Sequence, residues 1–425
     1  MQRIIKNLKL KRRGIALLAG MHFYGNPSKK IKIVGVTGTN GKTTTATLLY
    51  KITIGLGYKA GLISTVENII NGEIVLTKEG RPIPGTTPDP VNLYKLLNEM
   101  AEKGCEYVFM EVSSHALDQN RVAGISFAGG IFTNLTHDHL DYHKNFENYF
   151  GAKKKFLKML PQHAFALSNT DDEYGEKMLE EIKTGRVSYG FNGGEDFHGE
   201  ITKLGFSGLV LNFNGIEVSS KLLGKFNAYN LLAVWSACEL LGFDMDIVKK
   251  ILENIEPPRG RFEHFLSKSS VLVIVDYAHT PDALEKILMA IKDLLASGEN
   301  EVNQPKAGKI ISVFGCGGDR DPLKRPLMGE IGVNNSDITI FTSDNPRSED
   351  PDKIIDQMKE SLSDEMLKKV KTITNRHEAI MEAVKIAQKG DIILCAGKGH
   401  EDYQEIKGVK HHFSDIEEFR KSYAK

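Results

Sequence analysis

The stretch Gly35–Thr45 reads Gly-Val-Thr-Gly-Thr-Asn-Gly-Lys-Thr-Thr-Thr and decides the fold. A short apolar run, Ile31–Val36, precedes it, and apolar residues at helical spacing follow from Ala46 onward. A strand, a glycine-rich turn and a helix in this order are typical of phosphate-binding sites, because glycines let backbone N–H groups close around phosphate oxygens. The stretch therefore predicts a nucleoside triphosphate site after the first strand.

Residues of this turn have separate predicted roles. Lys42 is expected to reach the outer phosphates, and Thr43 to hold a magnesium ion. The spacing is a variant, because Val36 stands where the common pattern has its first glycine. The alternative is a glycine-rich turn with a chance lysine. The predicted nucleotide-binding residues of the turn are Gly38, Thr39, Asn40, Gly41, Lys42, Thr43 and Thr44.

Length and composition narrow the class of protein. A chain of 425 residues suits two domains, and a formal net charge of zero does not favour nucleic acid as a partner. The four cysteines lie far apart without metal-type spacing, which indicates small apolar residues in a reducing cytoplasm. No apolar run reaches the roughly 18 residues of a membrane span. We therefore expect a cytoplasmic monomer that acts on small molecules, without stable membrane insertion.

The N-terminal residues 1–20 mix apolar side chains with lysine and arginine. They lack the continuous apolar stretch of a signal peptide. One interpretation is a helix packed on the body of the protein with a solvated basic face. The other is a basic amphipathic helix that meets an anionic membrane.

Apolar, β-rich runs alternate with helical stretches, which favours βαβ units, parallel sheets and an α/β fold. We predict a short N-terminal remnant or basic helix at 1–30, a central parallel-sheet P-loop ATPase domain at 31–256 and a C-terminal Rossmann-like α/β domain at 257–425. A small antiparallel insert is predicted near 187–221, and a linker at Pro257–Gly260. The predicted strands are Ile31–Val36, Ala60–Ser64, Tyr107–Glu111, Gly130–Thr133, Ala164–Ser168, Val271–Asp276, Ile310–Gly315, Ile338–Thr342, Lys371–Ile373 and Ile392–Ala396.

Two predicted strands of the first domain end in polar segments, Glu111–His115 and Asn134–His143. Functional residues are expected there, because open parallel sheets bind ligands at the carboxyl ends of their strands. Zinc is disfavoured, since His137, Asp138 and His139 lack a cysteine or glutamate partner at metalloprotease spacing. Beside a phosphate loop, a magnesium role for one histidine and one carboxylate fits better. A polar loop without a ligand is the alternative.

Six further segments carry polar residues in a characteristic order: Asn227–Asn230, Arg259–Glu263, Asp276–Pro281, Gly315–Asp321, Asp344–Arg347 and Gly397–Asp402. With the phosphate loop and the two polar strand ends, they resemble the Mur ligase family, the ATP-dependent amide ligases of peptidoglycan synthesis. The resemblance runs from about Ala19 to Gln404. Within the family, it is strongest to the members that add the third residue of the stem peptide.

The resemblance implies a reaction in two steps. The D-Glu carboxylate of UDP-MurNAc-L-Ala-D-Glu attacks the γ-phosphate of ATP, and the amine of meso-diaminopimelate then displaces phosphate from the acyl phosphate. Lys42 and Thr43 match the positions that contact the phosphates and a first magnesium ion. Glu111 and His139 match the ligands of a second magnesium ion.

Lys153 aligns with a lysine that the family carbamylates with carbon dioxide. A carbamate replaces an ammonium, which would repel magnesium, with a carboxylate-like partner. Gly151 departs from the family, which usually has alanine there. Lys154 and Lys155 follow directly, so the assignment stays open by one position, and a plain surface lysine is the alternative.

The resemblance also assigns binding residues for each substrate. For ATP, it implies Asn227 and Asn230 near the base, Asp276 at the ribose and Arg261 at the phosphates. For the acceptor, it implies that Arg347 pairs the far carboxylate of diaminopimelate and Glu401 its ammonium. The full acceptor set is Arg320, Asn345, Arg347, Gly397 and Glu401. The set that matches residues holding the muramoyl dipeptide and its pyrophosphate is Thr86, Thr87, Ser113, Gln119 and Arg121.

Members of the family normally carry an N-terminal domain that holds the uridine nucleotide, and the resemblance here covers only its tail, Leu17–Lys29. Three explanations stay open. The central domain holds UDP weakly by itself, a partner chain supplies the contact, or the donor is lipid-linked rather than UDP-linked. Two rival functions also stay open: a ligase with a folate-like donor, and a non-catalytic nucleotide-binding scaffold.

Overall fold

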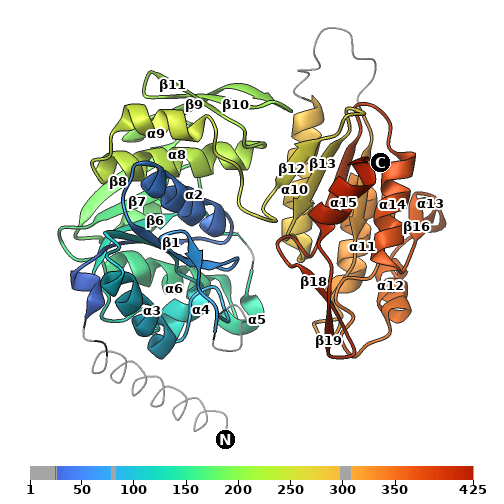
Figure 1. Ribbon diagram of the computed structural model, residues 1–425, viewed down its shortest axis with the longest axis horizontal. Coiled ribbons are helices and arrows are strands. Elements are labelled where there is room, and N and C mark those ends of the chain that lie inside the picture. Colours follow the sequence, from blue (N-terminus) through green and yellow to red (C-terminus); the bar gives the residue numbers. More distant parts are fainter. Residues whose placement is uncertain (1–23, 25, 78–82, 137, 297–307, 425) are drawn as a thin grey trace, which may run out of the picture. The chain divides into compact units, whose positions relative to one another are not determined.

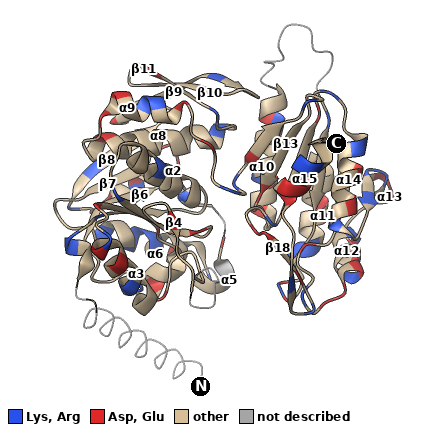
Figure 2. Ribbon diagram, in the orientation of Figure 1, with Lys and Arg blue, Asp and Glu red and all other residues tan. Residues whose placement is uncertain are grey.

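The computed structural model describes residues 24, 26–77, 83–136, 138–296 and 308–424. The predicted basic helix at 1–20 lies outside this part of the chain. The described residues divide into two compact units. The first comprises the chain up to Lys203 with Leu209–Leu222 and Phe226–Glu256, and the second comprises Pro257 onward with Leu204–Gly208 and Leu223–Lys225. Acidic and basic residues are distributed over both units, in keeping with the zero net charge (Figure 2).

An eleven-stranded sheet forms the centre of the first unit, in the order β11-β10-β9-β8-β7-β6-β1-β5-β2-β3-β4 (Figure 1). Its strands are β1 (Lys32–Thr37), β2 (Ala60–Ile63), β3 (Asn68–Ile70), β4 (Glu73–Ile74), β5 (Tyr107–Glu111), β6 (Phe127–Phe132), β7 (Phe165–Asn169), β8 (Gly185–Gly190), β9 (Phe197–Gly205), β10 (Gly208–Phe213) and β11 (Ile216–Ser220). The helices are η1 (Pro27–Lys29), α2 (Lys42–Gly55), α3 (Pro90–Glu102), α4 (Ser114–Asp118), α5 (Leu140–His143), α6 (Phe146–Lys158), α7 (Gly175–Leu179), α8 (Lys225–Leu240) and α9 (Met245–Leu252).

The central strands β2, β5, β1, β6, β7 and β8 pair in parallel, as the alternation of strands and helices predicts. Helices cover both faces of this sheet. Leu93 of α3 and Phe156 of α6 belong to one buried cluster with Ile33 and Phe127 of the strands, while α2 and α8 lie on the other face (Figure 1). The segment 187–221 adds strands to the same sheet: β8 pairs in parallel with β7, and β10 and β11 form an antiparallel pair.

The second unit has a six-stranded sheet in the order β12-β13-β17-β14-β15-β16, in which only the β12–β13 pair is antiparallel. Its strands, with the separate hairpin β18–β19, are β12 (Glu263–Leu266), β13 (Leu272–Asp276), β14 (Ile310–Phe314), β15 (Ile338–Phe341), β16 (Val370–Thr372), β17 (Ile392–Ala396), β18 (Tyr403–Ile406) and β19 (Val409–His412). Its helices are α10 (Pro281–Ala296), α11 (Lys324–Asn335), α12 (Pro351–Lys359), α13 (Asp364–Leu367), α14 (Arg376–Ile386) and α15 (Asp415–Ala424).

Successive side chains of β13 alternate between the two buried clusters of the second unit. Leu272 and Ile274 pack into a buried cluster with residues of α10, α11 and α12, while Val273 and Val275 pack into another with residues of α14 and α15. This is the period-two pattern of a strand covered by helices on both faces. All five strands predicted in this region are present, within one or two residues of their predicted ends.

Register brings the ends of neighbouring strands to one edge of each sheet. In the first unit, Val36 pairs with Glu111, and Thr37 pairs with Phe132. In the second, Ala396 pairs with both Asp276 and Phe314. The polar segments that follow these strands are therefore neighbours within each unit, although they are far apart in sequence. No helix of the described residues is long and apolar enough to cross a membrane.

Candidate functional site

The phosphate loop begins at Gly38, because Gly35 lies inside β1 and only residues after Thr37 leave the sheet. Two of its glycines are required by the space around them. A Cβ on Gly38 would lie 1.9 Å from Thr133 Oγ1, and one on Gly41, which has a φ of 83°, would lie 2.4 Å from Asn230 Oδ1. Gly41 is the N-cap of α2 and has no side chain to satisfy the first N–H groups of this helix, which leaves them for an anion.

The end of β6 holds the loop in shape. Thr133 Oγ1 donates to the Asn40 carbonyl oxygen at 2.6 Å. The Asn134 carbonyl accepts from Thr39 N at 2.8 Å, and Asn134 Oδ1 accepts from Asn40 N at 2.9 Å. The loop is thus held by hydrogen bonds from the residues that follow the neighbouring strand.

Two lysines meet at one carbonyl oxygen of this loop. Lys42 Nζ lies 2.9 Å from Gly38 O and 2.7 Å from Thr39 O, while Lys153 Nζ lies 2.6 Å from Gly38 O. The two lysines after Lys153 point elsewhere: Lys154 Nζ donates to Lys177 O at 2.6 Å, and Lys155 Nζ to Asn120 Oδ1. Of this lysine triplet, Lys153 alone lies at the loop.

Lys153 is fully buried on α6, with 1% of its surface exposed, and its ammonium lies over the ring of Tyr149. Burial lowers the pKa of Lys153 well below its usual value. The nearby charge of Lys42 lowers this pKa further, and Asp138 opposes the shift. The amine is therefore held toward its neutral, nucleophilic form.

Glu111 ends β5 beside the loop and is 1% exposed. Both of its carboxylate oxygens accept from Thr65, Oε1 from the backbone N–H at 2.7 Å and Oε2 from the hydroxyl at 3.2 Å. The Thr65 hydroxyl also lies 3.0 Å from Thr86 Oγ1. No ion pair of the described residues includes the Glu111 carboxylate.

The predicted donor residues form a connected network around Thr87. Thr87 Oγ1 donates to Glu111 O at 2.8 Å and accepts from Ser113 N at 3.1 Å, and its carbonyl accepts from Arg121 Nη1 at 2.7 Å. Arg121 Nε and Nη2 both donate to Gln119 Oε1. Thr86, Thr87, Ser113, Gln119 and Arg121 are thus brought together, next to Glu111.

His139 has a φ of 54°, and its side chain is 45% exposed. Its ring lies 4.8 Å from that of His115, and its backbone N–H donates to Asp138 Oδ1 at 2.8 Å. Partial burial lowers the pKa of His139, as do His115, Lys42 and Lys153, while Asp138 opposes the shift. The imidazole is therefore neutral near pH 7 and able to bind a metal. His137 lies outside the described residues.

The two predicted adenosine asparagines lie on α8. Asn230 Nδ2 donates to Asn227 Oδ1 at 3.0 Å, and both side chains are buried. Asn230 faces Gly41 of the phosphate loop, as the close approach of its Oδ1 shows. These two residues therefore join the nucleotide loop, and Thr43 and Thr44 are buried in the first turn of α2.

The other predicted nucleotide residues belong to the second unit. Asp276 accepts from Phe262 N and Ala278 N, both at 2.7 Å, and burial raises the pKa of its carboxyl to about 6. The guanidinium of Arg261 lies 4.8 Å from the ring centre of Tyr277. Its buried Nε has no hydrogen-bond partner among the residues that the structure describes.

The predicted acceptor residues gather where β14, β15 and β17 end. Gly317 lies against Arg347 and Arg320: a Cβ on it would be 3.0 Å from Arg347 Nη1 and 3.7 Å from Arg320 Cγ. Asn345 Nδ2 donates to Glu401 Oε2 at 2.7 Å.

Gly397 is the remaining residue of the predicted acceptor set. It has a φ of 112°, and a Cβ there would lie 2.5 Å from Asp344 Oδ2, so only glycine fits. Arg347 Nη1 donates to Gly318 O at 2.7 Å, and its Nε lies 3.5 Å from Glu405 Oε2.

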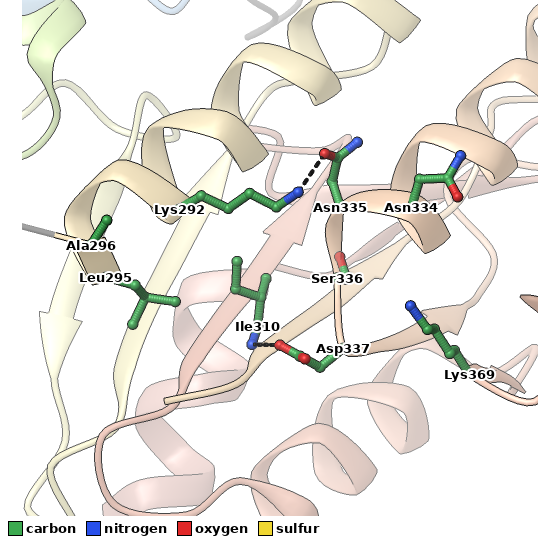
Figure 3. A pocket seen from close by; sticks show the side chains of 9 residues that line it. All are labelled: Lys292, Leu295, Ala296, Ile310, Asn334, Asn335, Ser336, Asp337 and Lys369. Atoms are coloured by element: carbon green, nitrogen blue, oxygen red, sulfur yellow. Dashed lines mark hydrogen bonds between the residues drawn. The ribbon is translucent and has the colours of Figure 1, made fainter. Parts of the chain in front are cut away.

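A hollow of about 370 Å³ lies elsewhere in the second unit, at the amino ends of β14 and β15 (Figure 3). Lys292 donates to Asn335 Oδ1 at 2.7 Å, and Ile310 N to Asp337 Oδ2 at 2.8 Å. None of the predicted site residues lines it.

Two known domain families match most of the chain. The Mur ligase middle domain matches residues 36–238, and the Mur ligase glutamate ligase domain matches residues 260–399. A curated relative from Phocaeicola vulgatus is 51% identical over 402 residues, which are 95% of this chain and 80% of the relative.

The chain belongs to the Mur ligase family.

The relative from Phocaeicola vulgatus is named UDP-N-acetylmuramoyl-L-alanyl-D-glutamate–2,6-diaminopimelate ligase. A relative of the same name from Clostridium botulinum is 41% identical to this Mur ligase over 96% of the chain and 80% of the relative. A solved structure of that enzyme matches with a TM-score of 0.64 and 33% identity, over 93% of this chain and 78% of that one. Folylpolyglutamate synthase from Thermotoga maritima matches with a TM-score of 0.67 at 16% identity, over 90% and 89% of the two chains, and shares the fold.

Several residues of this Mur ligase escaped the sequence analysis. Thr65 N donates a hydrogen bond to Glu111. Tyr142 accepts from Gln119 Nε2 at 3.0 Å and donates to Asp118 at 2.6 Å. Lys398 contacts both Asn345 and Glu401. For Thr65 the available signal was its position after the buried strand β2, whereas Lys398 lies within the segment Gly397–Asp402 that carries part of the family resemblance.

Proposed function

We propose that this chain is an ATP-dependent amide ligase that joins meso-diaminopimelate to the D-Glu carboxylate of UDP-MurNAc-L-Ala-D-Glu in peptidoglycan precursor synthesis. The observation that carries the proposal is that Arg347 and Glu401 lie in neighbouring segments of the second unit: Asn345, two residues before Arg347, donates to Glu401 Oε2 at 2.7 Å. Diaminopimelate has a carboxylate and an ammonium at its far end, which these two groups complement. The names of the relatives support the same substrates.

The first unit supplies the groups that activate a carboxylate. The donor carboxylate oxygen attacks the γ-phosphorus of ATP, and the bond to the β,γ-bridging oxygen breaks, which releases ADP and leaves an acyl phosphate. The first N–H groups of α2 and the ammonium of Lys42 hold the phosphates. The amine of the acceptor then attacks the acyl carbon, inorganic phosphate leaves, and the amine loses a proton.

Magnesium fits the residues around Glu111. Its carboxylate is buried, His139 is neutral, and Thr43 lies in the first turn of α2. Carboxylate and hydroxyl oxygens are ligands that magnesium prefers. We propose Thr43, Glu111, His139 and Lys153 as the residues that hold magnesium, which would offset the negative charge of the phosphates.

Carbamylation of Lys153 is part of this proposal. Only a neutral amine attacks carbon dioxide, and the lowered pKa of Lys153 favours that form. The nitrogen forms a bond to the carbon of CO₂ and loses one proton, which gives a carbamate anion. In the second unit, Arg261 and Asp276 are proposed to bind the phosphates and the ribose of ATP.

Replacing Arg347 with alanine is expected to raise the KM for diaminopimelate about 10- to 100-fold, since a charge-assisted hydrogen bond contributes about 1.5–3 kcal/mol. The KM for ATP should change less than about twofold, because Arg347 is assigned to the acceptor alone. Initial rates of phosphate release with each substrate varied in turn check this. Arg347→Lys keeps the charge without the planar fork and should recover little. An equal rise in both KM values would show that Arg347 does not touch the amino acid.

The decisive experiment measures phosphate release with UDP-MurNAc-L-Ala-D-Glu, ATP and a panel of amino acids. Release that depends on meso-diaminopimelate, and not on lysine or glutamate, is the expected result. Turnover only with a lipid-linked muramoyl dipeptide, or with a folate donor and glutamate, would replace the donor in this proposal. ATP binding without amino-acid-dependent phosphate release would favour a scaffold. We expect this activity in the cytoplasm, where ATP is available.

A further inference from the structure

Lys398 is a fully buried lysine next to the proposed acceptor site. It lies between the end of β17 and β18, with 0% of its surface exposed. Its ammonium donates to Tyr403 O and lies 3.3 Å from Asn345 Oδ1 and 3.5 Å from Glu401 Oε2. A buried ammonium is costly unless it is paired, and Glu401 is its only ion-pair partner among the described residues.

Glu401 is held through one oxygen only. Its Oε2 accepts from Asn345 Nδ2 at 2.7 Å and faces the ammonium of Lys398. Its Oε1 has no hydrogen-bond partner among the described residues, and the side chain is 17% exposed. One oxygen is thus anchored inside the protein, and the other is left to accept a hydrogen bond from a ligand.

The turn that carries both residues is tightly fixed. Glu401 N donates to Lys398 O at 3.0 Å, and Gly399 between them has a φ of 52°. A Cβ on Gly399 would lie 2.7 Å from Tyr277 Cβ, so the turn packs directly on the end of β13. The geometry of the Lys398–Glu401 pair is therefore set by packing and not by side-chain freedom.

Opposing influences act on the charge of Glu401. Burial raises the pKa of its carboxyl, and the nearby Asp344 raises it further. Lys398 and the hydrogen bond from Asn345 lower it. Tyr277 and Tyr403 also face the carboxyl, as uncharged groups near neutral pH. Lys398 is the one cation of the described residues that favours the carboxylate form.

We propose that Lys398 is a positioning residue that keeps Glu401 ionised and directs its Oε1 toward the far ammonium of the acceptor amino acid. This proposal rests on the proposed function, since it names a second determinant of the acceptor site. The ammonium of Lys398 does not touch the acceptor. It acts through the carboxylate, so its loss should affect the acceptor and not ATP.

The test compares Lys398→Met, Lys398→Arg and the exposed control Lys389→Met. Lys398→Met should lower kcat/KM for diaminopimelate by about tenfold or more, with less than about a twofold change in the KM for ATP. The acid limb of its profile of kcat/KM against pH should move upward by about one unit, because Glu401 has lost its cation. Lys398→Arg should restore the wild-type acid limb, and Lys389→Met should match the wild type. An unmoved acid limb, or equal changes in both KM values, would overturn the proposal.

A second measurement separates this proposal from the proposed function. Carboxyl-labelled glutamate, with the Glu401 resonance assigned from its absence in Glu401→Gln, reports the ionisation of Glu401 by NMR without any turnover. Its midpoint should rise in Lys398→Met. An unchanged midpoint would contradict the proposed role of Lys398, even if the protein is an active ligase. A wild-type enzyme that shows no diaminopimelate-dependent phosphate release would contradict the proposed function alone.

Discussion

Lys153→Ala is expected to lower the rate of ligation by at least about 10²–10³-fold, because it removes the proposed carbamate that helps to hold magnesium, the ion that offsets the charge of the transferring phosphate. The substitution should change the melting temperature little. It deletes one hydrogen bond to Gly38 O but also removes a buried amine whose charged form is costly. Phosphate release at saturating substrates and thermal unfolding of the same preparation check the two parts. Added formate or acetate is expected to restore part of the rate by supplying the missing carboxylate.

The neighbouring lysine is the matched control. Lys154 lies one position along the same helix, and its ammonium donates to Lys177 O, away from the loop. Lys154→Ala should therefore keep the wild-type rate within about twofold, as expected of a side chain outside such a site. Full activity of Lys153→Ala would remove the carbamate from the mechanism, and equal losses in both variants would point to a general effect of α6.

Arg376→Met is expected to destabilise the protein by about 3–5 kcal/mol, the largest effect on stability that we predict, because it leaves a buried carboxylate without its partner. Arg376 and Asp415 are both 0% exposed and form two contacts of 2.7 Å, from Nε to Oδ1 and from Nη2 to Oδ2. The same guanidinium donates to Ser343 O and Ala396 O, directly before the acceptor segments. Urea unfolding of the full chain measures the loss.

Two controls separate the pair from a general effect of charge. Arg376→Met combined with Asp415→Leu removes both charges and should recover much of the lost stability. Lys368→Met breaks an exposed pair with Glu365, whose side chains are 72% and 83% exposed, and should cost no more than about 1 kcal/mol. A loss in Arg376→Met as small as in Lys368→Met would show that the buried pair contributes little.

Local sequence patterns predicted the framework of both units. The apolar run before Gly38, the glycine-rich turn and the helical pattern after it became β1, the loop and α2. Strand runs such as Tyr107–Glu111 and Ile392–Ala396 were predicted with their observed ends. These features are encoded within short windows, because strand and helix periodicity and glycine turns depend on near neighbours.

The contacts between site residues could not be predicted from such short windows of sequence. Thr65 and Glu111 are separated by 46 positions, and Asn40 and Thr133 by 93. Parallel register decides which strand ends meet, and that register is set by the packing of helices on both faces of the sheet. No motif in the sequence marked Thr65 or Lys398 as a contact of a predicted carboxylate.

The sequence by itself determined the family, the strand-loop-helix that holds phosphate, and the residue types at each strand end, since these follow from local periodicity and composition. Only the tertiary structure decided which of Lys153, Lys154 and Lys155 turns inward. Successive residues of a helix point about 100° apart, so the choice depends on how α6 packs against the sheet and not on the residues themselves. The same packing placed the amine of Lys153 on Gly38 O and lowered its pKa, which turns an ordinary lysine into a candidate for chemistry.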